Sequence, residues 1–242
     1  MLNCISVSNM RESDRLTIEK YVPSKTLMYR AAMGVFFAVR WNGKITIAVG
    51  SGNNGGDGYA LAYILKSKGI VCEIVTLSEK RSEDGAFFAE KAEALGVFAK
   101  PYYKGCFEGS DIIVDCLLGT GFQGEVRQNY AEAITEINAG KAFVVSVDIN
   151  SGMNGDTGCS TLCVRSDITV TIGFVKNGLV TDEASKRIGR LVCADIGIVL
   201  DKEENKICSQ EEWKPEYFDK TNLILCPSFL DMATIDAKGF DL

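Results

Sequence analysis

The stretch that most constrains this chain is a glycine-rich turn between an apolar strand and an amphipathic helix, in residues 44–68. Ile45 to Val49 read as the strand, and apolar residues at helical spacing begin at Leu61. Nine positions between them hold five glycines: Gly50, Gly52, Gly55, Gly56 and Gly58. Such a turn lets a ligand approach the main chain, and the helix N-terminus that follows favours an anion such as phosphate. The alternative, a turn without a ligand, leaves the backbone entropy cost of five glycines unexplained.

Strand and helix patterns alternate along the rest of the chain. Apolar runs predict strands at 70–77, 111–118, 142–149, 167–172 and 189–196, and helical patterns fall at 9–21, 24–39, 84–96 and 127–139. Alternation of this kind, with strands that are apolar on both faces, predicts an α/β fold with a doubly wound, mostly parallel sheet. No repeat or low-complexity linker divides the chain, so we expect one domain over 1–242, with N-terminal helices in 8–40, a core sheet in 44–200 and a tail in 201–242.

Near the two ends of the chain, the sequence gives less evidence for secondary structure. Asn9 is a suitable N-cap for the first helix, with Glu12 three positions later. Within the tail, Asn222 to Cys226 is the one segment that we expect to form a strand, at the edge of the sheet.

Composition excludes several classes of function. The net charge of -6 argues against a nucleic-acid partner, because binding a phosphate backbone needs a basic face. The absence of histidine argues against a zinc site and against histidine-based proton transfer. The longest apolar run, Ala31 to Val39, is too short to span a membrane. The nine cysteines, without a recognisable signal peptide, fit reduced thiols in a cytoplasmic protein.

Three predicted strands end in glycine-rich or polar turns, at 50–58, 119–125 and 148–152. In open α/β sheets, ligands bind beyond the carboxyl ends of the strands. We therefore expect these three turns to converge on one crevice.

The first turn also matches G-x-G-x-x-G, the pattern of dinucleotide-binding oxidoreductases, at Gly50, Gly52 and Gly55. That pattern usually comes with an acidic residue at the end of the second strand, which binds the ribose. Here the second strand closes with Leu77 and Ser78. An ordinary dehydrogenase is therefore the weaker interpretation, and an assay for hydride transfer would detect it.

Asp115 is a carboxylate in an otherwise apolar predicted strand. A buried carboxylate is costly unless it is hydrogen-bonded, paired or bound to a cation. In one interpretation, neighbouring backbone N–H groups satisfy it. In the other, Asn54, Asp115 and Ser151 bind a cation, and neutral oxygens with one carboxylate suit K⁺ better than a transition metal.

Asp148 lies at the end of the strand predicted at 142–149, the fourth predicted strand of the chain. Its side chain could cap the following turn, as aspartate often does. It could instead transfer protons in the crevice, because burial raises the pKa of a carboxyl toward neutral pH. Both interpretations stay open on the residues alone.

Three stretches together resemble the signature motifs of the NAD(P)H-hydrate epimerase family, the YjeF N-terminal domain. They are GSGNNGGDG at 50–58, VDCLLGTGFQGEVR at 114–127 and VDINSGMNGDTG at 147–158. MRESDRLTIE and LMYRAA resemble that family's entry helices, and TVTIGFVKNGL and GRLVCADIGI its later strands, so the resemblance covers about residues 8 to 200.

The resemblance implies a Rossmann-like, three-layer αβα sandwich and a homodimer. It implies an isomerase that interconverts the R and S forms of hydrated NADH and NADPH (NADHX and NADPHX) at C6, with K⁺ bound by Asn54, Asp115 and Ser151. A separate NAD(P)HX dehydratase is the partner enzyme that it suggests. By position, the hydrate would contact Asn53, Asn54, Gly55, Gly56, Asp57, Gly119, Thr120, Gly121, Phe122, Gln123, Gly124, Glu125 and Asp148. We expect Asp148 to be the catalytic acid–base residue.

Two positions depart from the family pattern. Tyr29 and Arg30 stand where the family has an acid and an amide, and Asn150 stands where it has proline. If Arg30 lies at the pocket mouth, it could pair with a cofactor phosphate. The alternative function on the same fold is a non-catalytic nucleotide-binding or scaffold module, since fold alone does not decide function.

Overall fold

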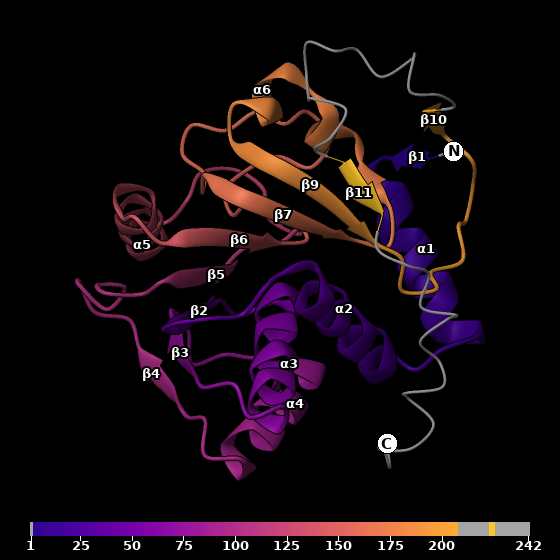
Figure 1. Ribbon diagram of the computed structural model, residues 1–242. Helices are drawn as coiled ribbons and strands as arrows, with labels where there is room; N and C mark the ends of the chain where they lie inside the picture. Colours follow the sequence, from indigo (N-terminus) through magenta and orange to yellow (C-terminus); the bar gives the residue numbers. More distant parts are fainter. Residues whose placement is uncertain (1, 208–222, 226–242) are drawn as a thin grey trace.

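The computed structural model describes residues 2–207 and 223–225, which form an α/β fold around an eight-stranded sheet (Figure 1). Its strand order is β11-β9-β7-β6-β5-β2-β3-β4, and all its pairings are parallel. The strands are β2 (Ile45–Val49), β3 (Cys72–Thr76), β4 (Ala99–Pro101), β5 (Ile112–Cys116), β6 (Phe143–Val147), β7 (Ser166–Ile172), β9 (Ile188–Ala194) and β11 (Leu223–Leu225). The predicted doubly wound sheet is confirmed.

Helices cover both faces of this sheet. The helices are α1 (Val7–Lys20), α2 (Ser24–Ala38), α3 (Asn53–Ser67), α4 (Glu83–Ala94), α5 (Gln128–Ala139) and the short α6 (Asp182–Ser185), with a 3₁₀ turn at Asn177–Val180. Side chains of β2 alternate between the two faces: Ile47 and Val49 join the core under α2, α3 and α4, and Ala48 joins the core under α5. These three layers are the αβα sandwich that the resemblance implies.

The chain reverses its direction across the sheet between β2 and β5. From β2 the sheet grows to β3 and β4 on one side, whereas β5 and β6 lie on the other. Parallel register places Val49 beside Cys116 and Ala48 beside Asp115. A crevice beyond the carboxyl ends is expected at this switch point, and it is where the predicted site residues lie.

The first helix begins two residues earlier than the sequence predicts. Ser6 is its N-cap, and the Ser6 hydroxyl accepts a hydrogen bond from the Asn9 backbone N–H at 3.2 Å. Asn9 lies inside the helix and is buried, with Nδ2 donating to the Lys202 carbonyl at 2.8 Å. The prediction of Asn9 as N-cap is therefore wrong, because a segment far along the chain takes its side chain.

A second, three-stranded sheet was not predicted. It joins β1 (Leu2–Ile5) to β8 (Val175–Lys176) in parallel and to β10 (Asn205–Ile207) in antiparallel pairing. Strand β11 pairs with β9 at the end of the main sheet, which confirms the edge strand expected near 222–226. The rest of the tail, 208–222 and 226–242, lies outside the described residues.

Two further expectations can be checked in the described part of the chain. None of its helices combines the length and the apolarity needed to cross a bilayer. Its cysteines are all free thiols, and Cys72, Cys116 and Cys193 lie in strands as predicted.

Candidate active site

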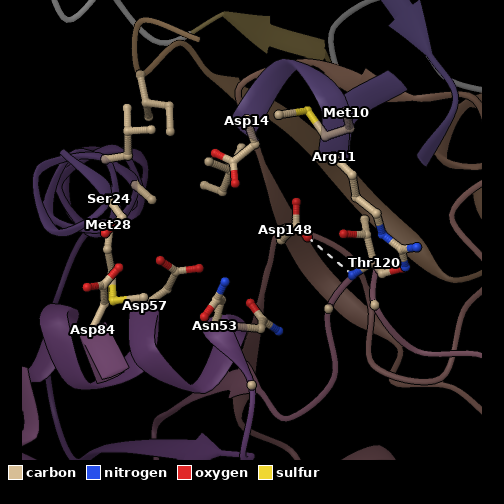
Figure 2. A pocket seen from close by; sticks show the side chains of 18 of the residues that line it. Met10, Arg11, Asp14, Ser24, Met28, Asn53, Asp57, Asp84, Thr120 and Asp148 are labelled. Atoms are coloured by element: carbon tan, nitrogen blue, oxygen red, sulfur yellow. Dashed lines mark hydrogen bonds between the residues drawn. The ribbon is translucent and has the colours of Figure 1, made fainter. Parts of the chain in front are cut away.

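A cavity of about 520 Å³ opens above the carboxyl ends of β2, β5 and β6 (Figure 2). Its floor is the start of α3 and the turn after β5, and its other walls come from α1, α2 and the segment after β9. Residues with polar side chains or exposed backbone on its walls are Arg11, Asp14, Ser24, Ser51, Gly52, Asn53, Asn54, Asp57, Asp84, Gly119, Thr120, Gly121, Asp148 and Lys176. Two of the three predicted turns and the Asp148 side chain therefore meet in this cavity.

The predicted turn at 119–125 borders two separate hollows. Gly119 to Phe122 line the main cavity, but Gln123, Gly124 and Glu125 line a neighbouring hollow of about 350 Å³. Phe122 contributes to both. The turn after β5 thus separates two spaces that the sequence treats as one.

Close backbone contacts explain two of the glycines in the first turn. A Cβ on Gly50 would lie 2.0 Å from the Leu117 carbonyl oxygen, and one on Gly55 would lie 2.2 Å from the Gly50 carbonyl oxygen. Gly55 and Gly56 lie in the first turn of α3, and neither is among the residues that line the cavity. Their role is to let the strand, the turn and the helix pack, which leaves the α3 N-terminus open toward the cavity.

Asp148 follows β6 in a left-handed backbone conformation, with φ of +66°. Among the described residues it is the only non-glycine residue in that region, which aspartate tolerates better than most residues. Its Oδ1 pairs with Lys176 Nζ at 2.6 Å, and its Oδ2 accepts from the Thr120 backbone N–H at 3.4 Å. The carboxylate is therefore held between β8 and the turn after β5.

Lys176 is 1% exposed, so Asp148 faces a fully buried ammonium. The three protons of Nζ have three acceptors: Asp148 Oδ1, Thr171 Oγ1 at 3.1 Å and the Ile172 carbonyl at 2.7 Å. A buried charge is costly without such partners. The pair therefore fixes the position of the Asp148 carboxylate.

Other carboxyls share this cavity with Asp148. Figure 2 shows Asp14 from α1 and Asp57 from α3 directed into the space in front of it, with Asp84 from α4 farther along the wall. Burial, followed by the nearby charge of Asp148, raises the pKa of Asp14. The same two causes, in the same order, raise the pKa of Asp57 well above its usual value. The cavity thus contains a lysine-paired carboxylate, Asp148, and two carboxyls, Asp14 and Asp57, that retain protons more readily than an exposed aspartate.

Of the three residues expected to bind K⁺, Asn54 lines the cavity, whereas Asp115 and Ser151 do not. Asp115 is fully buried, and four donors reach its two oxygens: the Ser146 hydroxyl at 2.8 Å, the Ser151 N–H at 2.9 Å, the Leu117 N–H at 3.3 Å and the Ser151 hydroxyl. Burial raises its pKa, and these hydrogen bonds oppose that effect. Serine hydroxyls, as well as the backbone N–H groups that the first interpretation expected, therefore donate to Asp115.

Asn54 is different, because neither its side-chain oxygen nor its nitrogen has a hydrogen-bond partner although both are buried. A buried amide without partners is costly, so an absent ligand is the simplest explanation for it. The oxygen donors of Asn54, Ser151 and Asp115 fit a hard, singly charged cation. The set fits K⁺ in chemistry, and Asn54 is its unsatisfied member.

Comparison with known proteins agrees with this geometry. The family model described as YjeF-related protein N-terminus matches residues 24–178. NAD(P)H-hydrate epimerase from Limosilactobacillus fermentum is 35% identical over 199 residues, which cover 79% of this chain and 95% of that protein. The chain belongs to the NAD(P)H-hydrate epimerase family.

Other relatives place the chain within this epimerase family. The NAD(P)H-hydrate epimerase of Weissella koreensis is 34% identical over 82% of this chain and 93% of its own. The bifunctional NAD(P)H-hydrate repair enzyme Nnr of Coxiella burnetii is 34% identical, but the match covers only 40% of that protein. The crystal structure of yeast ynu0 has the same fold, with a TM-score of 0.67 at 20% identity over 87% of this chain and 98% of that one.

Lys176 and Asp14 line the cavity but were not among the site residues predicted from the sequence. Lys176 stands in FVKNG, a stretch that reads as an ordinary strand end with an exposed lysine. Asp14 stands among charged residues of an amphipathic helix. Both stretches carry the family resemblance, which was the available signal that they belong to the site.

Arg30 does not line the main cavity, where we expect the phosphate of a bound cofactor. Its guanidinium donates to the Ile196 carbonyl at 3.3 Å, beside Gly197, and the main cavity is lined by Met28 and Ala31 of α2 but not by Tyr29 or Arg30. The condition for pairing Arg30 with a cofactor phosphate, a place at the mouth of this cavity, is therefore not met. Arg30 instead holds the 196–198 segment, whose Ile196 and Ile198 line the cavity.

Proposed function

We propose that this protein epimerises the hydrated nicotinamide cofactors NADHX and NADPHX at C6, as its family membership indicates. The observation that carries the proposal is the meeting of two features in one cavity. One is the open N-terminus of α3, which suits a phosphate group, and the other is the Asp148 carboxylate held by Lys176. Together they allow the nucleotide to be held while protons move at its ring.

The substrate is a carbinolamine with a hydroxyl on C6, next to the ring nitrogen. The nitrogen lone pair expels the hydroxyl when the leaving oxygen is protonated, and C6 becomes planar. Water then returns to the opposite face and loses a proton. A carboxyl group beside C6 can carry such protons, and proton transfer of this kind contributes about 10²–10⁴-fold in rate.

Asp148 is the residue that we assign to proton transfer at C6. Its carboxylate faces the cavity, and its backbone and Oδ1 are both fixed, by the left-handed turn and by Lys176. A fixed group with few alternative orientations keeps the entropy cost of reaction low. Neither a hydride acceptor nor a covalent nucleophile is needed.

The remaining predicted residues bind and orient the hydrate in this proposal. Asn53 and Asn54 begin α3, and Gly119 lies between the two sides of the site: a Cβ on Gly119 would lie 3.1 Å from Asn54 Cβ and 3.4 Å from Asp148 Oδ2. Only a glycine leaves room for a ligand to reach both groups. Asn54, Asp115 and Ser151 would hold K⁺, which would supply a fixed positive charge to this part of the site.

The test is incubation of the purified protein with R-NADHX and separation of the products by chromatography. We expect S-NADHX to appear and the mixture to approach the same ratio from either pure epimer. Binding of the hydrate without any change in epimer composition would favour the non-catalytic module instead. Parallel assays with NADPHX would measure the preference between the two substrates.

The family resemblance also leads us to propose a cytoplasmic homodimer that works with a separate NAD(P)HX dehydratase. Two of the relatives are named as bifunctional repair enzymes, which shows that this type of domain occurs joined to a second activity. Size-exclusion chromatography with light scattering measures the oligomeric state directly. Coupled turnover with an added dehydratase tests the partner.

A further inference from the structure

Asp57 has no assigned chemical role, yet its position in the cavity is well defined. It lies in the second turn of α3, three residues after Asn54, and Figure 2 shows its carboxyl directed toward the space in front of Asp148. Within the described part of the chain, no hydrogen bond or ion pair engages this carboxyl. An acceptor or donor that lines a ligand cavity without a protein partner is available to a ligand.

The helix that carries Asp57 is held rigidly on both sides. A Cβ on Gly56 would lie 2.5 Å from Met28 Cε and 3.2 Å from Gly85 Cα, and one on Gly58 would lie 2.7 Å from Val49 Cγ1. Because Gly56 and Gly58 have no room for a side chain, α3 packs closely against α2, α4 and β2. Asp57 and the substrate-binding turn before it therefore keep a constant relative position.

The charge balance of the cavity makes Asp57 unlike Asp148. Lys176 is the buried cation of the site, and its three donors are taken by Asp148, Thr171 and Ile172. Arg11, at the rim, donates to the Thr120 carbonyl at 3.2 Å. The groups that face Asp57 are Asp148 after β6, Asp14 on α1, Asp84 on α4 and the Cys116 thiol on β5, with Lys176 as the only compensating charge among them. Burial and these carboxylates raise the pKa of Asp57, so it retains a proton where Asp148 has a cationic partner.

We propose that Asp57 is a second proton-transfer residue of the epimerase site, which protonates the leaving hydroxyl while Asp148 accepts the proton of the incoming water. This proposal rests on the proposed function. It assigns to two carboxyls, Asp57 and Asp148, the two proton transfers that were assigned above to Asp148 alone. The two carboxyls come from different walls of the cavity, as loss and return of water on opposite faces of a ring require.

The steps balance without any further reactant. The C6–O bond breaks as the ring nitrogen donates its electron pair and the Asp57 proton moves to the oxygen, which releases water and leaves an iminium and an Asp57 carboxylate. Water then attacks C6 from the other face, the electron pair returns to the nitrogen, and Asp148 takes the extra proton. Transfer of that proton through cavity water from Asp148 to Asp57 restores the starting state. Pairs of carboxyls with different proton affinities commonly divide acid and base roles in this way.

The pH dependence of epimerisation distinguishes this role from a structural one. Asp57 must be protonated to act as an acid, so kcat/KM from R-NADHX should fall as the pH rises through its pKa. Asp57→Asn should lower kcat by about 10²-fold or more and remove that fall. Asp57→Glu keeps the titrating group and should retain the fall, with part of the rate.

Matched variants complete the experiment. Asp84→Asn removes a carboxylate that raises the pKa of Asp57 but does not itself transfer a proton, so it should lower kcat far less and move the fall in kcat/KM to lower pH. Circular dichroism and hydrate binding show whether each variant is folded and can bind. The proposal would be overturned if Asp57→Asn kept the wild-type kcat and an unchanged pH profile. It would also be overturned if Asp14→Asn, rather than Asp57→Asn, lowered kcat and removed the fall of kcat/KM at high pH. A wild-type protein without epimerase activity would instead contradict the proposed function itself.

Discussion

Asp115 and Asp57 both lie near the carboxyl edge of the same sheet, but Asp115 is fully buried whereas Asp57 is partly exposed to the cavity. Four hydrogen-bond donors from three residues hold Asp115, whereas Asp57 faces a cavity and other carboxyls. Burial raises the pKa of both, but only around Asp115 do hydrogen bonds oppose the rise. The comparison shows that burial alone does not predict a role. A satisfied carboxylate stabilises the turn around it, and an unsatisfied one is free to exchange a proton with a ligand.

Asp148 lies between these two extremes. It has one charged partner, Lys176, one weak backbone donor, Thr120, and one side open to the cavity. It is fixed like Asp115 and accessible like Asp57. This combination is what a proton-transfer residue requires, because position and access are both needed.

The largest effect is expected where the accessible carboxylate is removed. Asp148→Asn should slow epimerisation by about 10²–10⁴-fold. Asparagine also tolerates the left-handed backbone at this position, so the turn should persist. The measurement is the initial rate of S-NADHX formation, with nucleotide binding as the control.

Removal of Asp148 also leaves Lys176 without its anion, and that cost must be separated from chemistry. Breaking one side of a buried pair costs about 3–5 kcal/mol in other proteins. The double variant Asp148→Asn, Lys176→Met removes both charges and should recover part of this stability while it stays inactive. Recovery of activity in the double variant would contradict the assignment of Asp148.

Removal of the hydrogen-bonded Asp115 carboxylate should show the opposite pattern, with a large effect on the free energy of unfolding. Asp115→Ala leaves the donors of Ser146, Ser151 and Leu117 buried without an acceptor, at about 1–3 kcal/mol for each unsatisfied group. We expect a clear loss in the free energy of unfolding, measured by urea titration. Stability within about 0.5 kcal/mol of wild type would show that the network is not structural.

Asp57 should reduce stability at high pH rather than support it. Its pKa is higher in the folded protein than in the unfolded chain, where it is about 3.9. The folded state therefore binds more protons between these two values, and the free energy of unfolding falls as the pH rises, by at most about 1.4 kcal/mol per pH unit. Asp57→Asn should remove this loss and be more stable than wild type at pH above the folded value. Parallel unfolding curves for the two proteins across the pH range would contradict this, and Asp14→Asn, whose pKa is also raised, is the matched control.

The smallest effect is expected from the cation. Replacing K⁺ by a bulky organic cation at equal ionic strength should lower the free energy of unfolding by on the order of 1 kcal/mol, since a ligand of the native state stabilises it. Asn54→Ala removes the unsatisfied buried oxygen and should abolish the difference between the two salts. An equal response in wild type and Asn54→Ala would place the cation elsewhere.

Local patterns sufficed to predict part of this site. The five glycines predicted the turn and the open helix end, and the reason is space rather than backbone conformation: none of the five has a positive φ, but a Cβ on Gly50 or Gly55 would lie 2.0 or 2.2 Å from a backbone oxygen. The apolar neighbours of Asp115 predicted its burial, because β5 is covered on both faces. These features depend on residues that are adjacent in sequence.

The remaining features depend on contacts between distant segments. Lys176 meets Asp148 only because β8 joins a small sheet with β1, which the sequence did not indicate. The sequence left open whether Arg30 lies at the pocket mouth, and its guanidinium donates to the carbonyl of Ile196, far along the chain. Side chains on α1 have similar distant partners: the hydroxyls of Ser13 and Thr17 accept hydrogen bonds from the backbone of 199–201. Periodicity and turn chemistry contain no information on such pairings.

The central claim is that the C6–O bond breaks and re-forms between carboxyls in this cavity. The most direct measurement is epimerisation of R-NADHX in H₂¹⁸O, with mass spectrometry of the S-NADHX formed at early times. The account predicts that enzyme-formed S-NADHX carries one solvent oxygen, and that Asp148→Asn forms it no faster than the uncatalysed reaction. S-NADHX that forms at the wild-type rate with its original oxygen retained would contradict the account, because inversion would then proceed without loss of the hydroxyl.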